Sequence, residues 1–219
     1  MTIQLGKAQD LLKTYGIGIL TAPKCEASRI PLYETVNGEE PGAFITQVSK
    51  VEYNFFRMID NNDRIVNLHA SDAVSIGYEE VALTVFEEND YGFKVALNHT
   101  NGEGYWISKT DVKRYHLSHW SWMDYLTKNY VTLFPEALGI PMNLREQPNA
   151  TSNKLATLDT DVYQITPTGK TDGLWAQVSV SLFSAPYCED AVFKRKFTGW
   201  VKLLDDKGYP NLWFYAKGC

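Results

Sequence analysis

The positions of apolar residues along the chain indicate β-structure over most of its length. In residues 81–85 and 93–97, apolar side chains alternate with other residues, a period of two that is typical of half-buried strands. Turn-forming residues separate such stretches, among them the cluster at 37–42 and an Asn-Gly pair at 101–102 that favours a two-residue hairpin. Many short strands joined by regular turns predict an all-β fold.

Two segments have the helical period instead. Apolar side chains recur on one face of residues 7–15, which predicts a short N-terminal helix that ends at Gly16. Residues 118–128 also predict a short helix, with Ser118 or Ser121 as the N-cap.

A domain boundary near residues 129–141, where proline and glycine punctuate the chain, separates two halves that can be laid over each other. Each half carries an insert, near 46–77 in the first and near 181–196 in the second, and surface loops tolerate insertions of this kind. Three landmarks correspond: residues 30–33 match 142–145, residues 91–95 match 173–178, and residues 104–107 match 199–201.

The second half also contains a series of motifs. In order they are Met-Asn-Leu-Arg at 142–145, a Pro/Asn/Ser loop at 148–153, apolar residues at 155–158, Trp-x-x-Val at 175–178 and Gly-Trp-Val at 199–201. This series resembles a bacterial SH3-like (SH3b) domain over about residues 140–219. The first half, about residues 24–115, resembles a diverged copy, with Tyr33 where the family often has Arg and Gly-Tyr-Trp-Ile as its closing motif.

The resemblance implies two small SH3-like β-barrels joined by a short helix. Members of this class are often exported and bind cell-wall peptides or other extracellular ligands, so it also implies an extracytoplasmic protein. Residues 1–6 lack the features of a signal peptide, which leaves a removed signal or a cytoplasmic location as alternatives. The implied parts are an N-terminal helical segment at 1–23, a first barrel at 24–115, a helical linker at 116–139 and a second barrel at 140–219.

Composition narrows the classes of partner. The chain has 219 residues, of which 44% are apolar and 13% aromatic, which suffices for folded cores and excludes general disorder. A net charge of −5 lacks the basic footprint of a nucleic-acid binder or a polybasic membrane anchor. No apolar run approaches the ~20 residues that span a bilayer, so no transmembrane segment is expected.

Motifs for catalysis are weak. Two barrels leave no room for a separate catalytic domain, so Cys25 is interpreted as a buried or disulfide-bonded cysteine. The adjacent carboxylates at 39–40, 79–80, 87–88 and 205–206 are interpreted as solvated charge, because neighbours on a strand point to opposite faces. We therefore expect no enzyme and no cofactor. An enzyme with an unrecognised site between the barrels stays open as an alternative.

The histidines give a weak metal signal. His116 and His119 are three residues apart, so on a helix they would share a face and, with Asp124, could hold a metal ion. No HExxH motif supports this. Both are interpreted as exposed or hydrogen-bonded residues at a helix start, and no metal is expected.

Aromatic residues suggest a binding surface, since 6 Trp, 13 Tyr and 10 Phe exceed what two small cores require. Tyr105 and Trp106 are neighbours on a predicted strand, so one should face outward while the other enters the core. The alternative is that these rings attach the linker helix to the barrel. The candidate ligand-binding residues are Tyr33, Tyr105, Trp106, His116, His119 and Trp120.

These expectations favour a non-enzymatic tandem binding or scaffolding protein for a peptide or cell-wall fragment. A targeting or regulatory partner of a separate cell-wall hydrolase is the alternative. Ligand identity and oligomeric state stay open. Among the three cysteines, Cys188 and Cys219 are the candidate disulfide, because they share the second barrel and bracket its insert. Such a bond would stabilise the fold by roughly 3–4 kcal/mol.

Overall fold

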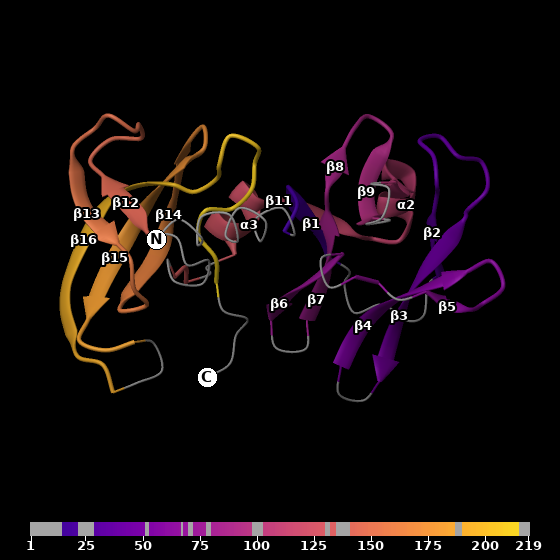
Figure 1. The fold of residues 1–219 in the computed structure, drawn as a ribbon, viewed down its shortest axis with the longest axis horizontal. Helices are drawn as coiled ribbons and strands as arrows, with labels where there is room; N and C mark the ends of the chain where they lie inside the picture. The colour runs from indigo at the N-terminus through magenta and orange to yellow at the C-terminus, as the bar shows by residue number, and fades with distance from the viewer. Residues whose placement is uncertain are drawn as a thin grey trace, which may run out of the picture. The chain divides into compact units, whose positions relative to one another are not determined.

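The computed structural model describes residues 15–21, 29–50, 53–66, 68–69, 72–77, 80–97, 103–129, 132–134, 141–186 and 190–214. Over these residues strands predominate and the helices are the short α2 and α3, so the predicted all-β class is confirmed (Figure 1). No closed barrel is found in this part of the chain. Neither of its helices is long and apolar enough to cross a membrane. Of the helix expected over 7–15, all but Tyr15 lies outside the described residues, and Tyr15 is in a turn.

The chain divides into two compact units, residues 14–120 and residues 121–219, here called the first and the second unit. Antiparallel pairing in the first unit gives three sheets with the strand orders β11-β1-β7-β6, β2-β3-β4-β5 and β10-β9-β8. The elements are β1 (Gly18–Thr21), β2 (Arg29–Leu32), β3 (Ala43–Lys50), β4 (Tyr53–Asp60), β5 (Ile65–Val66), β6 (Ala73–Gly77), β7 (Glu80–Val85), β8 (Glu87–Glu88), β9 (Gly92–Leu97), β10 (Gly104–Ser108), α2 (Lys109–Arg114) and β11 (Ser118–Ser121).

One apolar core joins the three sheets of the first unit. Most of its members come from alternate positions of the strands, as the period of two in the sequence predicts. Burying such side chains is the main favourable term in folding. The core comprises Leu20, Ile30, Leu32, Ala43, Ile45, Met58, Leu83, Val85, Phe93, Val95, Ala96, Ile107 and Leu117.

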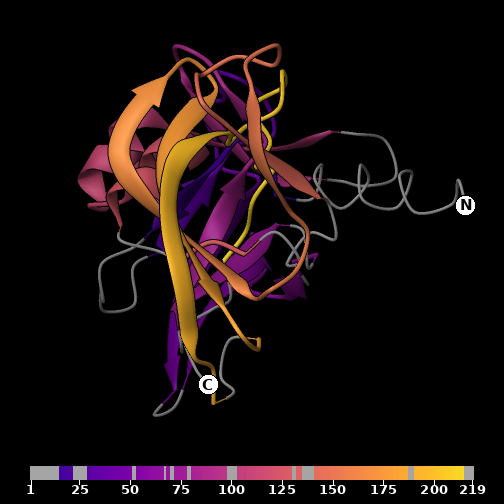
Figure 2. The same ribbon diagram turned by 90° about the vertical axis from the view of Figure 1, so that its left-hand side faces the viewer.

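The second unit contains one sheet with the strand order β13-β12-β16-β15-β14. Figure 2 shows its last strands as long, curved ribbons in orange and yellow. Helix α3 packs against β14, and its fully buried Trp122 lies 4.8 Å from Trp213, measured between ring centroids. The elements are α3 (Trp122–Lys128), β12 (Met142–Arg145), β13 (Lys154–Leu158), β14 (Tyr163–Asp172), β15 (Trp175–Phe183) and β16 (Phe193–Lys202).

Each unit contains the same order of strand pairings. In the first unit β3 pairs with β2, Tyr33 after β2 bridges Trp106 in β10, and β10 pairs with β9. In the second unit β13 pairs with β12, Arg145 in β12 pairs with Trp200 in β16, and β16 pairs with β15. The sequence overlay of 30–33 on 142–145 therefore places Tyr33 and Arg145 at corresponding bridging positions.

The segments that flank this common order correspond as well. In the first unit β1 lies between β11 and β7. In the second unit Leu133 bridges Ile165 in β14, and the next residue, Phe134, bridges Trp213 near the end of the described chain. In each unit a short segment that precedes the first landmark lies between a later strand of the unit and the unit's final segment.

The prediction of a helix over 118–128 is wrong for its first four residues. Ser118–Ser121 forms β11, which pairs with β1, and α3 begins only at Trp122. The Ser121 hydroxyl caps α3 by accepting a hydrogen bond of 3.1 Å from the Asp124 backbone N–H. The expected linker is therefore split, with β11 in a sheet of the first unit and α3 in the core of the second.

The described parts of both inserts contain paired strands, which the sequence did not predict. Strands β15 and β16 run on as a paired hairpin from Ser179, opposite Thr198, to Phe183, opposite Phe193. In the first unit, β3 pairs with β4 at the start of the other insert. Helix α2 was not expected from the sequence.

The close surroundings of Gly199 explain why the Gly-Trp-Val motif begins with glycine. A Cβ atom at this position would lie 2.7 Å from the Arg145 carbonyl oxygen and 2.8 Å from the Leu144 Cγ atom. Gly104, at the corresponding place in the first unit, would bring a Cβ to 2.4 Å from the Ala96 carbonyl oxygen. Close approach of a neighbouring strand therefore requires glycine at both positions.

We predict that Gly199→Ala lowers the free energy of unfolding by about 1–3 kcal/mol, because the added methyl group must push β12 away from β16. Urea denaturation measures the change. Thr198→Ala, at the exposed neighbouring position, is the control and should stay within the ~1 kcal/mol span of strand propensities. Equal effects of the two substitutions would contradict the close-approach explanation.

Candidate functional site

Tyr33 and Trp106, two of the predicted site residues, lie side by side in the first unit. The Tyr33 N–H donates to the Trp106 carbonyl over 2.9 Å, and the Trp106 N–H donates to the Tyr33 carbonyl over 2.7 Å. This bridge connects the end of β2 to β10, so main-chain hydrogen bonds fix where both side chains begin. The structure thus brings together residues that are far apart in the sequence.

Tyr105 and Trp106 do not divide into one exposed and one core residue. Trp106 is 6% exposed, and Tyr105 is half-buried against the apolar core. The register of β10 on β9 shifts between these residues, so that Tyr105 pairs with Ala96 and Trp106 with Lys94. Burial raises the pKa of the Tyr105 phenol, and the nearby Glu34 carboxylate raises it further.

A buried carboxylate that the sequence analysis did not single out lies beside this bridge. Asp111, in the first turn of α2, is 4% exposed. The Ser108 hydroxyl donates to its Oδ2 atom over 2.6 Å, and the Tyr33 hydroxyl donates to the same atom over 3.2 Å. The Asp111 backbone N–H in turn donates to the Ser108 hydroxyl oxygen over 2.9 Å, which caps the helix. One carboxylate therefore ties α2 to β10 and to the end of β2.

Tyr91 completes the group, which we call the Asp111 cluster: Asp111, Ser108, Tyr33 and Tyr91. The Tyr33 and Tyr91 rings meet edge to face, at 83° and 6.4 Å between centroids. The Tyr91 carbonyl accepts a 2.9 Å hydrogen bond from the Lys109 N–H at the start of α2, which lies against β9 (Figure 1). Both rings are therefore held on ordered backbone.

The electrostatics of the cluster act on both phenols. Burial raises the pKa of Tyr33, and the Asp111 charge and hydrogen bond, then Tyr91 and Tyr115, raise it further. Burial also raises the pKa of Tyr91, followed by the Asp111 charge. Both phenols accordingly stay protonated at neutral pH and serve as hydrogen-bond donors.

His116 and His119 do not share a helical face, so the geometry considered for a metal site is wrong. His116 follows α2 with a positive φ of 53°. Its N–H donates to the Lys113 carbonyl, and the Leu117 N–H donates to the Val112 carbonyl, the pair of bonds of a Schellman motif. The exposed His116 therefore occupies the helix-ending position that usually holds glycine.

His119 and Trp120 lie on β11, and both are half-buried. The His119 ring lies 4.3 Å from the Phe93 ring, and the Lys109 ammonium lies 5.6 Å from the same ring. Lys109 also pairs with Glu88 over 3.2 Å. Within the described ranges, no group of three or more His, Cys, Asp or Glu side chains could hold a metal ion.

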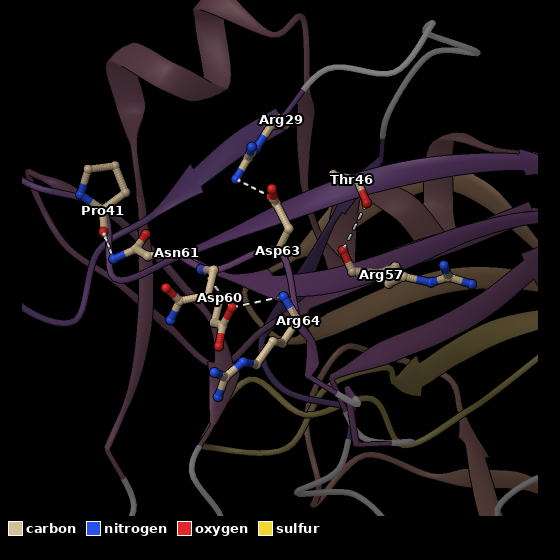
Figure 3. A network of polar contacts seen from close by, with 9 residues as sticks. Arg29, Pro41, Thr46, Arg57, Asp60, Asn61, Asp63 and Arg64 are labelled. Atoms are coloured by element: carbon tan, nitrogen blue, oxygen red, sulfur yellow. Dashed lines mark hydrogen bonds and ion pairs between the residues drawn. The ribbon is translucent and has the colours of Figure 1, made fainter.

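A second polar network lies at the turn between β4 and β5 (Figure 3). The Asp60 carboxylate accepts backbone hydrogen bonds from Asn62 over 2.8 Å and from Arg64 over 2.9 Å. The bond from Arg64 is the main reason that the pKa of Asp60 is lowered. Arg29 pairs with Asp63 over 3.1 Å, and both side chains are exposed. These contacts close a turn, and we assign them a structural role.

Cys25, Cys188 and Cys219 lie outside the described residues, so the disulfide expectation stays a prediction. Comparison of the chain with protein-family models, curated proteins and solved structures finds no match. The resemblance to SH3b domains therefore rests on the sequence motifs, and the proposals below rest on the residues of the chain itself.

We predict that the free energy of unfolding falls in alkali because of these phenols. Folding raises the pKa of Tyr33, Tyr91 and Tyr105 above 10.0, so the unfolded chain loses these protons first. Their contribution is fully present below pH ~10 and is lost as the pH rises through the folded pKa values. Urea denaturation from about pH 8 to about pH 11 measures the loss.

Tyr33→Phe should make this alkaline loss smaller, because one titrating group is removed. At neutral pH the same substitution should cost about 1 kcal/mol, since Asp111 loses a donor. Tyr105→Phe is the control at neutral pH, because no hydrogen bond joins the Tyr105 phenol to a described residue. An alkaline profile that is the same in wild type and Tyr33→Phe would contradict the assignment.

Proposed function

We propose that the chain is a non-enzymatic tandem SH3-like binding or scaffolding protein that acts outside the cytoplasm on a peptide or cell-wall fragment. The Asp111 cluster in the first unit is the proposed ligand surface. The observation that carries this proposal is the pair of half-buried tyrosine rings, one of them hydrogen-bonded to a buried carboxylate.

The restraint on the tyrosine rings of the Asp111 cluster favours ligand binding. Tyrosine offers a large amphipathic contact area and loses little conformational entropy, because it has few rotatable bonds. Tyr33 is restrained further by its hydrogen bond to Asp111 and by the backbone bridge to Trp106. A ligand that packs on these rings would therefore not have to order them first.

The electrostatics also favour binding over catalysis. A general base or nucleophile needs a pKa near the working pH. The pKa values of Tyr33 and Tyr91 are shifted upward, away from neutrality, so a smaller fraction of each phenol is ionised at neutral pH than in an unperturbed tyrosine. A regulatory partner of a separate cell-wall hydrolase would use the same surface and is the second proposal.

The test is an NMR titration of ¹⁵N-labelled full-length chain with a panel of peptidoglycan fragments. We expect shifts at Tyr33, Tyr91 and α2, and at least tenfold weaker binding by Tyr33→Ala. Trp120→Ala reports whether the surface extends to β11. Phe193→Ala, at a residue of the second unit that is 54% exposed, is the control and should bind as wild type does.

Shifts confined to the second unit would contradict the placement. Unchanged binding by Tyr33→Ala with an intact fold would contradict it equally. Binding of none of the fragments would overturn the proposed ligand class.

A further inference from the structure

We infer that β16 is a docking edge for an extended acidic segment of another protein, which adds to the sheet of the second unit as a further strand. The part of β16 that receives it, here called the free edge, is residues 194–198. This inference goes beyond the proposed function, because it concerns a different surface and a different class of partner. It follows from the unpaired side of β16 and from the charges along it.

The free edge has a strand on one side only, among the residues that the structure describes. β16 is the long yellow ribbon of Figure 2, and β15 pairs with it in a regular register as far as Leu182, opposite Arg195. On the other side β12 meets β16 at a single pair, Arg145 and Trp200. Residues 146–153 then turn back into β13, and a 3.0 Å hydrogen bond joins the two ends of this turn. β12 therefore does not continue along the free edge.

The backbone of the free edge can form a new ladder of hydrogen bonds. Antiparallel pairing with β15 uses the N–H and C=O groups of alternate residues. The groups of the residues in between aim away from β15, as they do on any sheet edge. A peptide that adds to such an edge gains affinity from main-chain hydrogen bonds, and side chains determine which peptide is accepted.

Three consecutive cations determine which segment the free edge accepts. Lys194, Arg195 and Lys196 are exposed, and none of them forms an ion pair with a residue in the described ranges. Lys202, further along the same strand, is by contrast paired with Asp206 over 2.6 Å. Because opposite charges on neighbouring strands attract, the unpaired cations favour a strand that carries consecutive carboxylates.

The same charges exclude a second copy of β16 as the occupant. Two free edges paired antiparallel about Arg195 would place Lys194 opposite Lys196 and Arg195 opposite its own copy. Like charges directly opposite each other destabilise a strand pair. Charged side chains on an edge commonly prevent self-pairing in this way. The free edge is thus protected from its own copy and open to an acidic strand.

An apolar position lies at the end of the free edge. Val192 is 69% exposed and Phe193 is 54% exposed. The Phe193 ring meets the Phe183 ring edge to face, at 5.9 Å between centroids, so it is held in place. We therefore expect an apolar residue beside the carboxylates of the segment. Asp190, close to these apolar residues, is exposed and acidic, which disfavours insertion among anionic lipids and favours a peptide as the partner.

The first test compares two peptides that differ only in charge. The acidic peptide is acetyl-Val-Glu-Glu-Glu-Thr-Val-amide, and the neutral peptide has Gln in place of each Glu. Each is titrated into the ¹⁵N-labelled full-length chain and followed by NMR. We expect the acidic peptide to shift the signals of residues 193–198. The neutral peptide should bind more weakly, by up to about fivefold for each charge removed.

A third peptide tests strand addition separately from charge. It has the acidic sequence with a methyl group on every backbone nitrogen, so it keeps its carboxylates and cannot donate to a ladder. We expect it to bind at least tenfold more weakly than the unmethylated acidic peptide. Equal binding would overturn strand addition, because general attraction between charges does not depend on backbone N–H groups.

Variants of the chain locate the surface. A triple variant replaces the cations of the free edge, Lys194→Gln, Arg195→Gln and Lys196→Gln, and should weaken binding of the acidic peptide by up to about fivefold for each cation. The matched control removes three other exposed cations of the second unit and changes the net charge equally. It is Lys154→Gln, Lys170→Gln and Lys207→Gln, and it should bind as wild type does.

The remaining outcomes overturn the inference in different ways. Equal binding of the acidic and neutral peptides, or equal losses in the triple variant and its control, would overturn selection by these cations. Vesicles of phosphatidylglycerol are titrated in parallel, and binding of vesicles without binding of the acidic peptide would replace the peptide by a lipid surface. None of these results changes the proposal for the Asp111 cluster, which the peptidoglycan fragments test separately.

Discussion

The buried carboxylate of Asp111 is the constraint on which the proposed surface depends. A charge removed from water is costly unless it is hydrogen-bonded or paired. Asp111 meets this requirement through Ser108 at the end of β10 and Tyr33 at the end of β2, with Arg114 at the solvent side. Satisfying one side chain thus fixes the helix start, the strand bridge and the orientation of a tyrosine ring together.

This arrangement connects core packing to the proposed ligand surface. Two residues of the first unit's apolar core flank α2. Ile107 lies one residue before the N-cap Ser108, and Leu117 follows the helix. Helix α2 is therefore anchored at both of its ends by apolar residues. Ser108 and Asp111 lie on this anchored segment. Tyr33 and Tyr91 are tied to it by the Tyr33 hydroxyl, which donates to Asp111, and by the Lys109 N–H, which donates to the Tyr91 carbonyl.

Much of the fold follows from the alternation of apolar residues. The period of two predicted the strands at 81–85 and 93–97, which are β7 and β9 in the structure. The overlay of sequence landmarks in the two halves agrees with the structure, because both units have the same order of strand pairing. The close strand contacts at Gly104 and Gly199 explain why both halves have glycine there. Local sequence pattern was therefore enough to predict the structure where burial in the core or the spacing between strands determines the residue type.

Local sequence pattern did not predict the structure at positions where contacts with distant parts of the chain determine it. His119 and Trp120 have a pattern that fits a helix, but β1 offers residues 118–121 a pairing edge. The hairpin beyond Ser179 has exposed residues on β16 and therefore lacks a continuous apolar signal. Asp111 was not singled out from the sequence, although the spacing Ser108-x-x-Asp111 resembles a capping box and could have located α2. Its contact with Tyr33 joins residues 78 positions apart, which no local pattern contains.

The central claim is that Tyr33 and Asp111 stabilise each other directly. A double-mutant cycle with Tyr33→Phe, Asp111→Asn and the combined variant, followed by urea denaturation at neutral pH, tests this claim. The account predicts that the two single losses do not add, with an interaction free energy of about 0.5–3 kcal/mol. Losses that add within about 0.3 kcal/mol would contradict it, because the two side chains would then act independently.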